Sequence, residues 1–151
     1  MKIATISLAL ALGLLSCQQQ QATAPTEKLA LVGPGTNPDL TITAISAPPT
    51  AARNTAISVI HTTQNIGTAP AMSTQTRFWI CTNTTVYGNY INTQVVGILN
   101  TGASVTLSNN NFIIPPGQPL GTNYIIAVCG YYINEITKAN NTNTCLLIVT
   151  P

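Results

Sequence analysis

Thr122-Asn-Tyr-Ile-Ile-Ala-Val-Cys-Gly130 predicts a β-strand that is apolar on both of its faces. Because successive side chains of a strand point to opposite sides, Ile125, Ala127 and Cys129 share one face. Tyr124, Ile126 and Val128 share the other face. A strand of this kind is buried on both sides, so it lies in the centre of a sandwich or is covered by something outside it.

Similar short runs rich in Thr, Val, Ile and Tyr recur on both sides of this stretch, with turn formers about every ten residues. Outside the N-terminal segment, no window shows the sustained spacing of an amphipathic helix. This pattern is typical of an all-β sandwich. The predicted strands span residues 39–46, 55–65, 73–82, 91–99, 103–114, 122–130 and 143–150.

Alternation also assigns the inward-facing side chains of the other strands. They are Ile57, Val59, His61 and Thr63 in the second strand, Phe78 and Ile80 in the third, and Cys145, Leu147 and Val149 in the last. His61 is the single histidine of the chain, and no metal-ligand spacing accompanies it. We therefore expect His61 to be a neutral, hydrogen-bonded core residue.

Charged residues make up 5% of the 151-residue chain, whereas about 25% is usual in soluble domains. Beyond residue 36 they are Asp39, Arg53, Arg77, Glu135 and Lys138. So low a charge gives no long-range steering, which argues against nucleic acid as a partner. It also removes a common guard against self-association.

Leu14-Leu15-Ser16-Cys17 ends an apolar run of about thirteen residues, shorter than the about 20 that span a bilayer. A basic residue, a short apolar run and a small-residue site indicate a secretory signal. The stretch resembles the lipobox of bacterial lipoproteins, which implies cleavage after Ser16 and lipidation of Cys17. An ordinary signal with an incidental cysteine is the alternative. Gln18 after the cysteine favours the outer membrane or cell surface over the inner membrane.

Three parts follow from this organisation: a signal peptide (1–16), a lipidated N-terminus and flexible tether (17–38), and a β-sandwich (39–151). Within the tether, Lys28 to Val32 include a short apolar run. It is either a linker patch or a spare strand that a second copy accepts. The second alternative predicts a self-assembling extracellular filament or surface-layer subunit.

Three stretches resemble CARDB, the cell-adhesion-related domain of bacterial surface proteins. They are 38–42 (PDLTI), 65–71 (NIGTAPA) and 121–127 (GTNYIIA), the last followed by 133–135 (INE) and Asn140-Asn141. The resemblance covers about residues 38–150. It implies a seven-stranded, immunoglobulin-like Greek-key β-sandwich on extracellular proteins, without catalytic machinery. Lys138, His61 and Gly130-Tyr131-Tyr132 depart from the family pattern.

Cys81, Cys129 and Cys145 remain beyond the N-terminal region, and outside the cytoplasm cysteines form disulfides. Cys129 and Cys145 lie on one face near the ends of neighbouring strands, and a turn centred on Thr137 would place them opposite each other. Some members of the family carry cysteines at similar places. Cys81 with Cys129 is the competing pair. Otherwise Cys81 lies outside, either as an inert free thiol or as a link between chains.

The residues of the predicted sandwich offer little for catalysis, since its carboxylates, Asp39 and Glu135, lie in separate segments. We therefore expect no enzyme activity, no cofactor and no metal. Asp39, Glu135 and Asn141 form a thin calcium set, because calcium takes about six to eight oxygen ligands. Glu135 and Asn141 more simply brace the last turn.

Five aromatic residues form the candidate binding site: Trp79, Tyr87, Tyr90, Tyr131 and Tyr132. Trp79 points away from Phe78, and Tyr131-Tyr132 lie in a connection. Such rings either cap the ends of the sandwich or form a patch for a protein or glycan at the cell surface. The expected function is non-catalytic binding or adhesion at the cell envelope, with the membrane contacted through the N-terminal lipid.

Overall fold

A computed structural model describes residues 36–85 and 87–151, which fold into two packed β-sheets. The strands are β1 (Leu40–Ser46), β2 (Thr50–Ala52), β3 (Ala56–Asn65), β4 (Thr74–Cys81), β5 (Asn89–Val96), β6 (Ser104–Ile113), β7 (Gly121–Tyr131) and β8 (Thr142–Thr150). Within this part of the chain, no helix has the length and apolar character to cross a membrane. The predicted signal, Cys17 and residues 28–32 lie outside the described residues.

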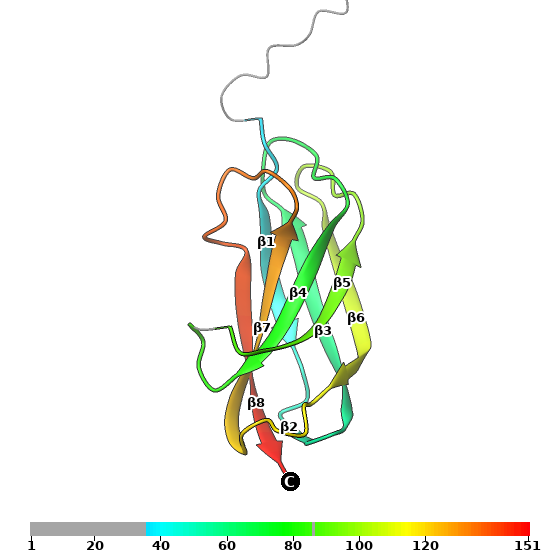
Figure 1. Cartoon of the computed structure of the whole chain (residues 1–151). Coiled ribbons are helices and arrows are strands. Elements are labelled where there is room, and N and C mark those ends of the chain that lie inside the picture. Colours follow the sequence, from blue (N-terminus) through cyan, green and yellow to red (C-terminus); the bar gives the residue numbers. More distant parts are fainter. Residues whose placement is uncertain (1–35, 86) are drawn as a thin grey trace, which may run out of the picture. The chain divides into compact units, whose positions relative to one another are not determined.

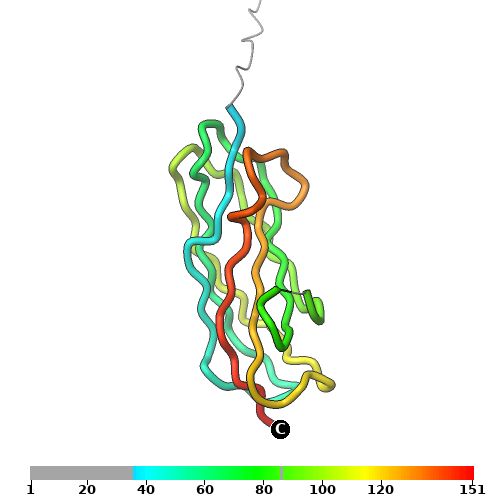
Figure 2. The backbone as a smooth tube through the Cα atoms, turned by 90° about the vertical axis from the view of Figure 1, so that its left-hand side faces the viewer, coloured from blue at the N-terminus to red at the C-terminus, as the bar shows by residue number. Residues whose placement is uncertain are grey.

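One sheet has the order β1-β3-β6 and the other the order β2-β8-β7-β4-β5 (Figure 1). The paired strands are antiparallel, except that β2 pairs in parallel with β8. Between β1 and β2 the chain crosses from one sheet to the other through Pro48-Pro49. In Figure 2, β1 accordingly runs beside β8 where the two sheets meet. The all-β sandwich is confirmed.

The seven predicted strands are present, but the structure adds an eighth, β2, which the sequence did not reveal. With three residues, β2 is too short for alternation to be recognised. Its pairing of Thr50 with Ile148 covers the C-terminal part of β8 at the edge of the sheet.

The core lies between the sheets and is built from the predicted inward faces. Phe78 and Phe112 meet edge to face, with ring centroids 5.6 Å apart, and both are fully buried. Ile125, Ala127 and Cys129 of β7 enter this core, while Ile126 and Val128 face the other way. The two apolar faces of β7 are thus both buried, as its sequence predicted.

Asn65, fully buried at the end of β3, fastens three loops through its side-chain amide. Its oxygen accepts hydrogen bonds from the backbone N–H groups of Asp39 (3.2 Å) and Gly67 (3.0 Å). Its nitrogen donates to the carbonyl oxygens of Ala69 (2.8 Å) and Leu99 (3.0 Å). Gly67 lies so close to the chain before β1 that a Cβ would stand 2.4 Å from the nitrogen of Asp39. Asn65 and Gly67 therefore serve the fold.

The predicted disulfide between Cys129 and Cys145 is wrong for this structure, in which both are free thiols. Cys145 pairs with Ile125, four residues along β7 from Cys129. At about 3.3 Å per residue, that offset far exceeds the about 7 Å that a disulfide spans between Cα atoms. The β7–β8 connection is centred nearer residue 135 than 137, because the N–H of Cys129 bonds the carbonyl of Asn141 (3.0 Å).

Cys81 faces the outer side of β4, opposite to the face that Cys129 occupies on β7, so these two cannot pair either. Cys81 is free and on the outer face of the strand, as expected, and it is buried there beneath the outer cluster of side chains. Its Sγ lies 2.6 Å from the carbonyl oxygen of Asn83, in the loop that follows β4. This burial does not suit a thiol that links two chains.

His61 is fully buried and packs edge to face on Phe78, with ring centroids 5.2 Å apart. Its inward position is confirmed, but the expected hydrogen bond is wrong, since neither ring nitrogen has a partner among the described residues. Burial lowers the pKa of His61 to about 4. A buried polar atom without a partner costs about 1–3 kcal/mol. His61 is therefore a point of weakness in the core.

Replacing His61 with Phe should raise the free energy of unfolding at pH 7 by about 1–3 kcal/mol, because it removes the unpaired nitrogens. It should also remove a pH dependence. The pKa of His61 is lowered on folding, so the unfolded chain binds the proton first as the pH falls from about 6.5 to about 4, and the wild type loses about 3 kcal/mol. Urea unfolding at pH 7, 5.5 and 4 measures both effects. Parallel pH profiles for the two proteins would contradict this assignment.

Candidate binding site

A second, smaller apolar cluster lies on the outer face of the five-stranded sheet. Cys81, Ile126 and Val128 form its buried floor. Trp79 and Tyr131 pack over them and are themselves half-buried. The strand register explains the arrangement, since Trp79 of β4 pairs with Ile126 of β7 and both point outward. We call this cluster with its surrounding rings the aromatic surface.

The aromatic surface brings together the five predicted rings. Trp79 is at its centre, with ring-centroid distances of 4.7 Å to Tyr87, 6.0 Å to Tyr90 and 6.2 Å to Tyr131. Tyr132 adjoins Tyr131, with centroids 6.3 Å apart. Tyr87, Tyr90 and Tyr132 are exposed. The rings therefore lie over the outer face of β4, β5 and β7, and do not cap an end of the sandwich.

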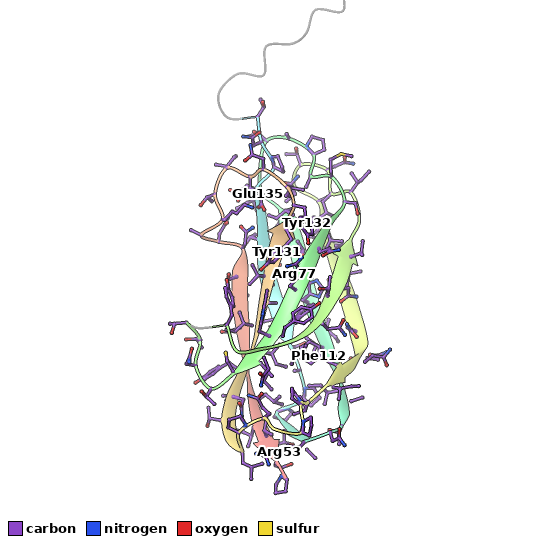
Figure 3. All side chains as sticks on the ribbon, viewed as in Figure 1. Arg53, Arg77, Phe112, Tyr131, Tyr132 and Glu135 are labelled. Atoms are coloured by element: carbon purple, nitrogen blue, oxygen red, sulfur yellow. The ribbon has the colours of Figure 1, made fainter. Side chains whose placement is uncertain are left out.

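Arg77 extends the aromatic surface toward the β7–β8 connection. Its guanidinium carbon lies 4.1 Å from the ring centroid of Tyr131 and 5.2 Å from that of Tyr132. An Nη of Arg77 also donates a hydrogen bond to the hydroxyl of Tyr132. Figure 3 shows the three side chains gathered beside β4. These cation–π contacts hold the two tyrosine rings in place.

Tyr132 has a backbone φ of 70°, a left-handed conformation that bulky residues seldom adopt. Backbone strain of this kind costs on the order of 1–3 kcal/mol and gathers at functional sites. With 78% of its surface exposed, the Tyr132 side chain recovers little of that cost by burial. The strained backbone of Tyr132 therefore holds its ring in solvent and not in the core.

A groove of about 240 Å³ lies between the loop before β5 and the β7–β8 connection. Its lining includes Tyr87, Val128, Tyr131, Tyr132, Lys138 and Asn141. None of the described residues that line it is acidic. Burial raises the pKa of Tyr131, so its hydroxyl is a neutral hydrogen-bonding group at pH 7. The groove offers flat apolar rings with an amide and one cation at the side, which suits an uncharged partner.

Glu135 and Asn141 brace the β7–β8 connection beside this groove, as predicted. One Glu135 oxygen accepts from the backbone N–H of Leu40 (2.8 Å) and the other from the amide of Asn141 (2.9 Å). Asp39 accepts instead from the amide of Asn140 (2.9 Å). Burial raises the pKa of Glu135. Across the described ranges, no three His, Cys, Asp or Glu side chains gather as a metal site would require.

Gly130 allows the carboxylate of Glu135 to lie against the backbone of β7. A Cβ at this position would stand 1.7 Å from Oε1 of Glu135, and the φ of Gly130 is 75°. Two features therefore coincide where the sequence departs from the family pattern, at residues 130–132. Gly130 leaves room for the carboxylate of Glu135, and the rings of Tyr131 and Tyr132 border the groove.

Sequence reasoning placed Trp79 outward but did not include Arg77, Lys138 or the floor residues Ile126 and Val128 in the site. For Arg77 a signal was available, because it precedes Trp79 by two residues and so shares its face of the strand. Lys138 carried no such signal, since its place depends on how the β7–β8 connection folds.

Comparison with protein families matches residues 37–146 to CARDB. The CARDB domain of a Pyrococcus furiosus protein, solved in complex with di-metal ions, is similar with a TM-score of 0.58 and 23% identity. The match covers 77% of this chain and 91% of that one. A domain of a predicted cell-surface protein from Methanosarcina acetivorans matches with a TM-score of 0.57 and 22% identity, over 76% and 93% of the two chains.

A β-glucosidase from Listeria innocua also matches, with a TM-score of 0.50 and 12% identity, over 76% of this chain and 16% of the enzyme. At that identity the likeness concerns the fold alone. A comparison with curated protein sequences gives no match.

Gly130→Ala should destabilise the domain by more than about 3 kcal/mol, because the new methyl group displaces Glu135 from its two hydrogen-bond donors. Gly121→Ala is the matched control: its φ is also positive (88°), but a Cβ there meets nothing within 4 Å. The control should cost only the about 1–2 kcal/mol of a left-handed alanine. Urea unfolding of both variants gives the difference, and equal losses would show that the contact with Glu135 contributes nothing.

Proposed function

Because the chain belongs to the CARDB family, we propose that it is a non-catalytic module that binds a protein or glycan at the bacterial cell surface. The observation that carries this proposal is the aromatic surface around Trp79. Three tyrosine rings are exposed beside a half-buried tryptophan and a groove. Aromatic residues of this kind dominate binding energies at interfaces.

The chemistry of the surface favours an uncharged partner. Arg77 packs against two tyrosine rings, and Lys138 is the one cation among the described residues that line the groove. Partner recognition would therefore rest on ring stacking and on neutral hydrogen bonds, with little dependence on salt. Both a glycan and an uncharged protein surface fit that description.

We further propose that the domain is held at the cell envelope by a lipid on Cys17, in a lipoprotein whose signal peptide is residues 1–16. The support is the sequence Leu14-Leu15-Ser16-Cys17, since these residues lie outside the described part of the chain. Gln18 supports the outer membrane or cell surface as the destination. The predicted strand donation by residues 28–32 remains an alternative function, self-assembly into a filament or surface layer.

Binding can be followed through Trp79, the single tryptophan of the chain, whose emission should change when a ligand covers the aromatic surface. The mature chain would be screened on a glycan array and against purified envelope proteins. Hits would then be titrated by fluorescence at 50 and 500 mM salt. A dissociation constant that changes less than about twofold between the two salts is expected for an uncharged interface. Ligands that bind without affecting Trp79, or only at low salt, would count against this site.

Tyr132→Asn should separate binding from folding. Asparagine tolerates the left-handed backbone, so the free energy of unfolding should stay the same or rise by about 1 kcal/mol. Loss of the exposed ring should weaken binding by at least about tenfold, as for a residue at the centre of an interface. Ile113→Asn, an exposed apolar position on β6 of the other sheet, is the control and should leave binding unchanged. Equal affinities for wild type and Tyr132→Asn would remove Tyr132 from the site.

Cys17→Ser should abolish lipid attachment and move the protein from the membrane fraction to the soluble fraction, because serine lacks the thiol that carries the lipid. Mass spectrometry of the mature N-terminus and fractionation of cells expressing each form provide the measurements. Cys81→Ser is the control and should remain in the membrane fraction. A wild-type N-terminus without lipid would disprove the lipoprotein assignment while leaving the binding site untouched.

A further inference from the structure

β5 is the outermost strand of the five-stranded sheet, and β4 is its one hydrogen-bonded neighbour (Figure 1). At both sides of the sandwich, side-chain amides of the five-stranded sheet form hydrogen bonds with backbone carbonyls of the three-stranded sheet. The amides of Asn92 and Gln94 on β5 donate to the carbonyl oxygens of Asn111 (3.4 Å) and Ser108 (3.1 Å) on β6. At the opposite side of the sandwich, Asn143 of β8 donates to the carbonyl of Ile42 on β1 (2.8 Å). β5 thus covers the edge of β6 while its own edge stays without a strand.

β5 carries little of the protection that exposed edges usually have. Its sequence, Asn89 to Val96, contains no charged residue and no proline, the residues that commonly block pairing with another chain. The pairing with β4 is irregular between Phe78 and Trp79, but it is regular from Asn92 to Val96. That C-terminal half of β5 is therefore regularly paired with β4 and carries no charge.

Apolar side chains adjoin this same half of the edge. Val95 is 62% exposed on the outer face, and Ile98, just beyond the strand, is also 62% exposed. Met72, 65% exposed, lies opposite Ile98, because the neighbouring residues Ala71 and Leu99 form a β-bridge. The N–H of Thr93 is bonded to Oδ1 of its neighbour Asn92 (2.7 Å), so the edge that remains open lies around Val95. Met72, Val95 and Ile98 are the exposed apolar side chains next to it, and a further β-strand would cover this strip.

The charge around the strip decides what can lie there. Arg77, on the strand next to β5, is already held by Tyr131 and Tyr132. No other charged residue lies in β4 or β5. Because β5 itself carries no charge, two copies of it can approach each other without electrostatic repulsion between the strands. Antiparallel pairing of identical edges also satisfies the symmetry of a two-fold dimer, in which both copies use the same patch.

We propose that β5 is a self-association edge, on which β5 of a second copy pairs in antiparallel orientation. The two five-stranded sheets then become one continuous sheet. The two-fold axis of such a pair stands perpendicular to the sheet. The aromatic surfaces of both copies consequently face the same side. The dimer forms through backbone hydrogen bonds and the strip of Met72, Val95 and Ile98, independently of what the aromatic surface binds.

The test uses the mature chain with Cys17→Ser, so that neither lipid nor a thiol at residue 17 contributes to association. Sedimentation velocity over about 5 μM to 1 mM, with and without reductant, should show a reversible monomer–dimer equilibrium that reductant does not change. Amide hydrogen exchange at Val95 should slow as the concentration rises. A chain that stays monomeric up to 1 mM would overturn the proposal, and so would a dimer that reductant dissolves.

Val95→Lys should weaken the dimer by at least about tenfold, because it places like charges near each other across the two-fold axis. Ile60→Lys, an exposed apolar position on β3 of the other sheet, is the matched control and should dimerise as the wild type does. The unfolding midpoints of both variants are measured alongside, so that a loss of folding is recognised. A dimer that survives Val95→Lys unchanged would overturn the β5 edge as its interface.

Deletion of residues 27–33 distinguishes two candidate partners of the β5 edge: β5 of a second copy and a strand donated from the N-terminal segment. Pairing of β5 with β5 predicts that the deletion leaves the dimer intact. Loss of association on deletion would overturn the proposed occupant in favour of a strand donated from the N-terminal segment. Binding at the aromatic surface is followed separately through Trp79, so a failure of either proposal is distinguishable from a failure of the other.

Discussion

The side-chain amide of Asn65 connects the chain before β1, the loop after β3 and the chain around Leu99, from a fully buried position. Similar amides close both sides of the sandwich, at Gln94 over β6 and at Asn143 over β1. Each such bond contributes about 1 kcal/mol, comparable to an exposed ion pair but independent of salt. A domain with five charges beyond residue 36 thereby keeps its loops and edges fixed.

This neutral construction also shapes the aromatic surface. Arg77 is surrounded by rings, and Glu135 is turned inward to Leu40 and Asn141. The outer face of the five-stranded sheet therefore presents polarisable rings and amides where many domains present salt bridges. Gly130 is central to the arrangement, because it admits the carboxylate of Glu135 on one side while the chain turns to expose Tyr132 on the other.

The sandwich could be predicted because alternation of side chains is a local property, visible in single strands such as β3 and β7. β2 could not, since three residues carry no period and their pairing with β8 depends on a proline-directed crossing between sheets. The predicted disulfide between Cys129 and Cys145 was wrong because it assumed a different register between β7 and β8. Spacing along the chain does not determine where a ten-residue connection turns, and the contacts of Asn141 with Cys129 and Glu135 shift Cys145 by four positions.

Part of the candidate site was predictable because side chains alternate along β4. This alternation places Trp79 on the outer face, and Arg77, two residues earlier, on the same face. That Tyr87 folds back to within 4.7 Å of Trp79 depends on the loop after β4, where the backbone of Gly88 lies against Cys81. Such contacts between a loop and a sheet face leave no periodic trace in the sequence. Proximity of the five rings was therefore a hypothesis until their positions were known.

The free thiols have a consequence for how the protein is made. Burial raises the pKa of Cys129 to about 12 and that of Cys145 to about 11, so both stay protonated and slow to oxidise. Across residues 36–85 and 87–151 the strands pair and the core packs without a cross-link, because Cys81, Cys129 and Cys145 are all free. The domain should reach the same state whether the compartment around it is oxidising or reducing.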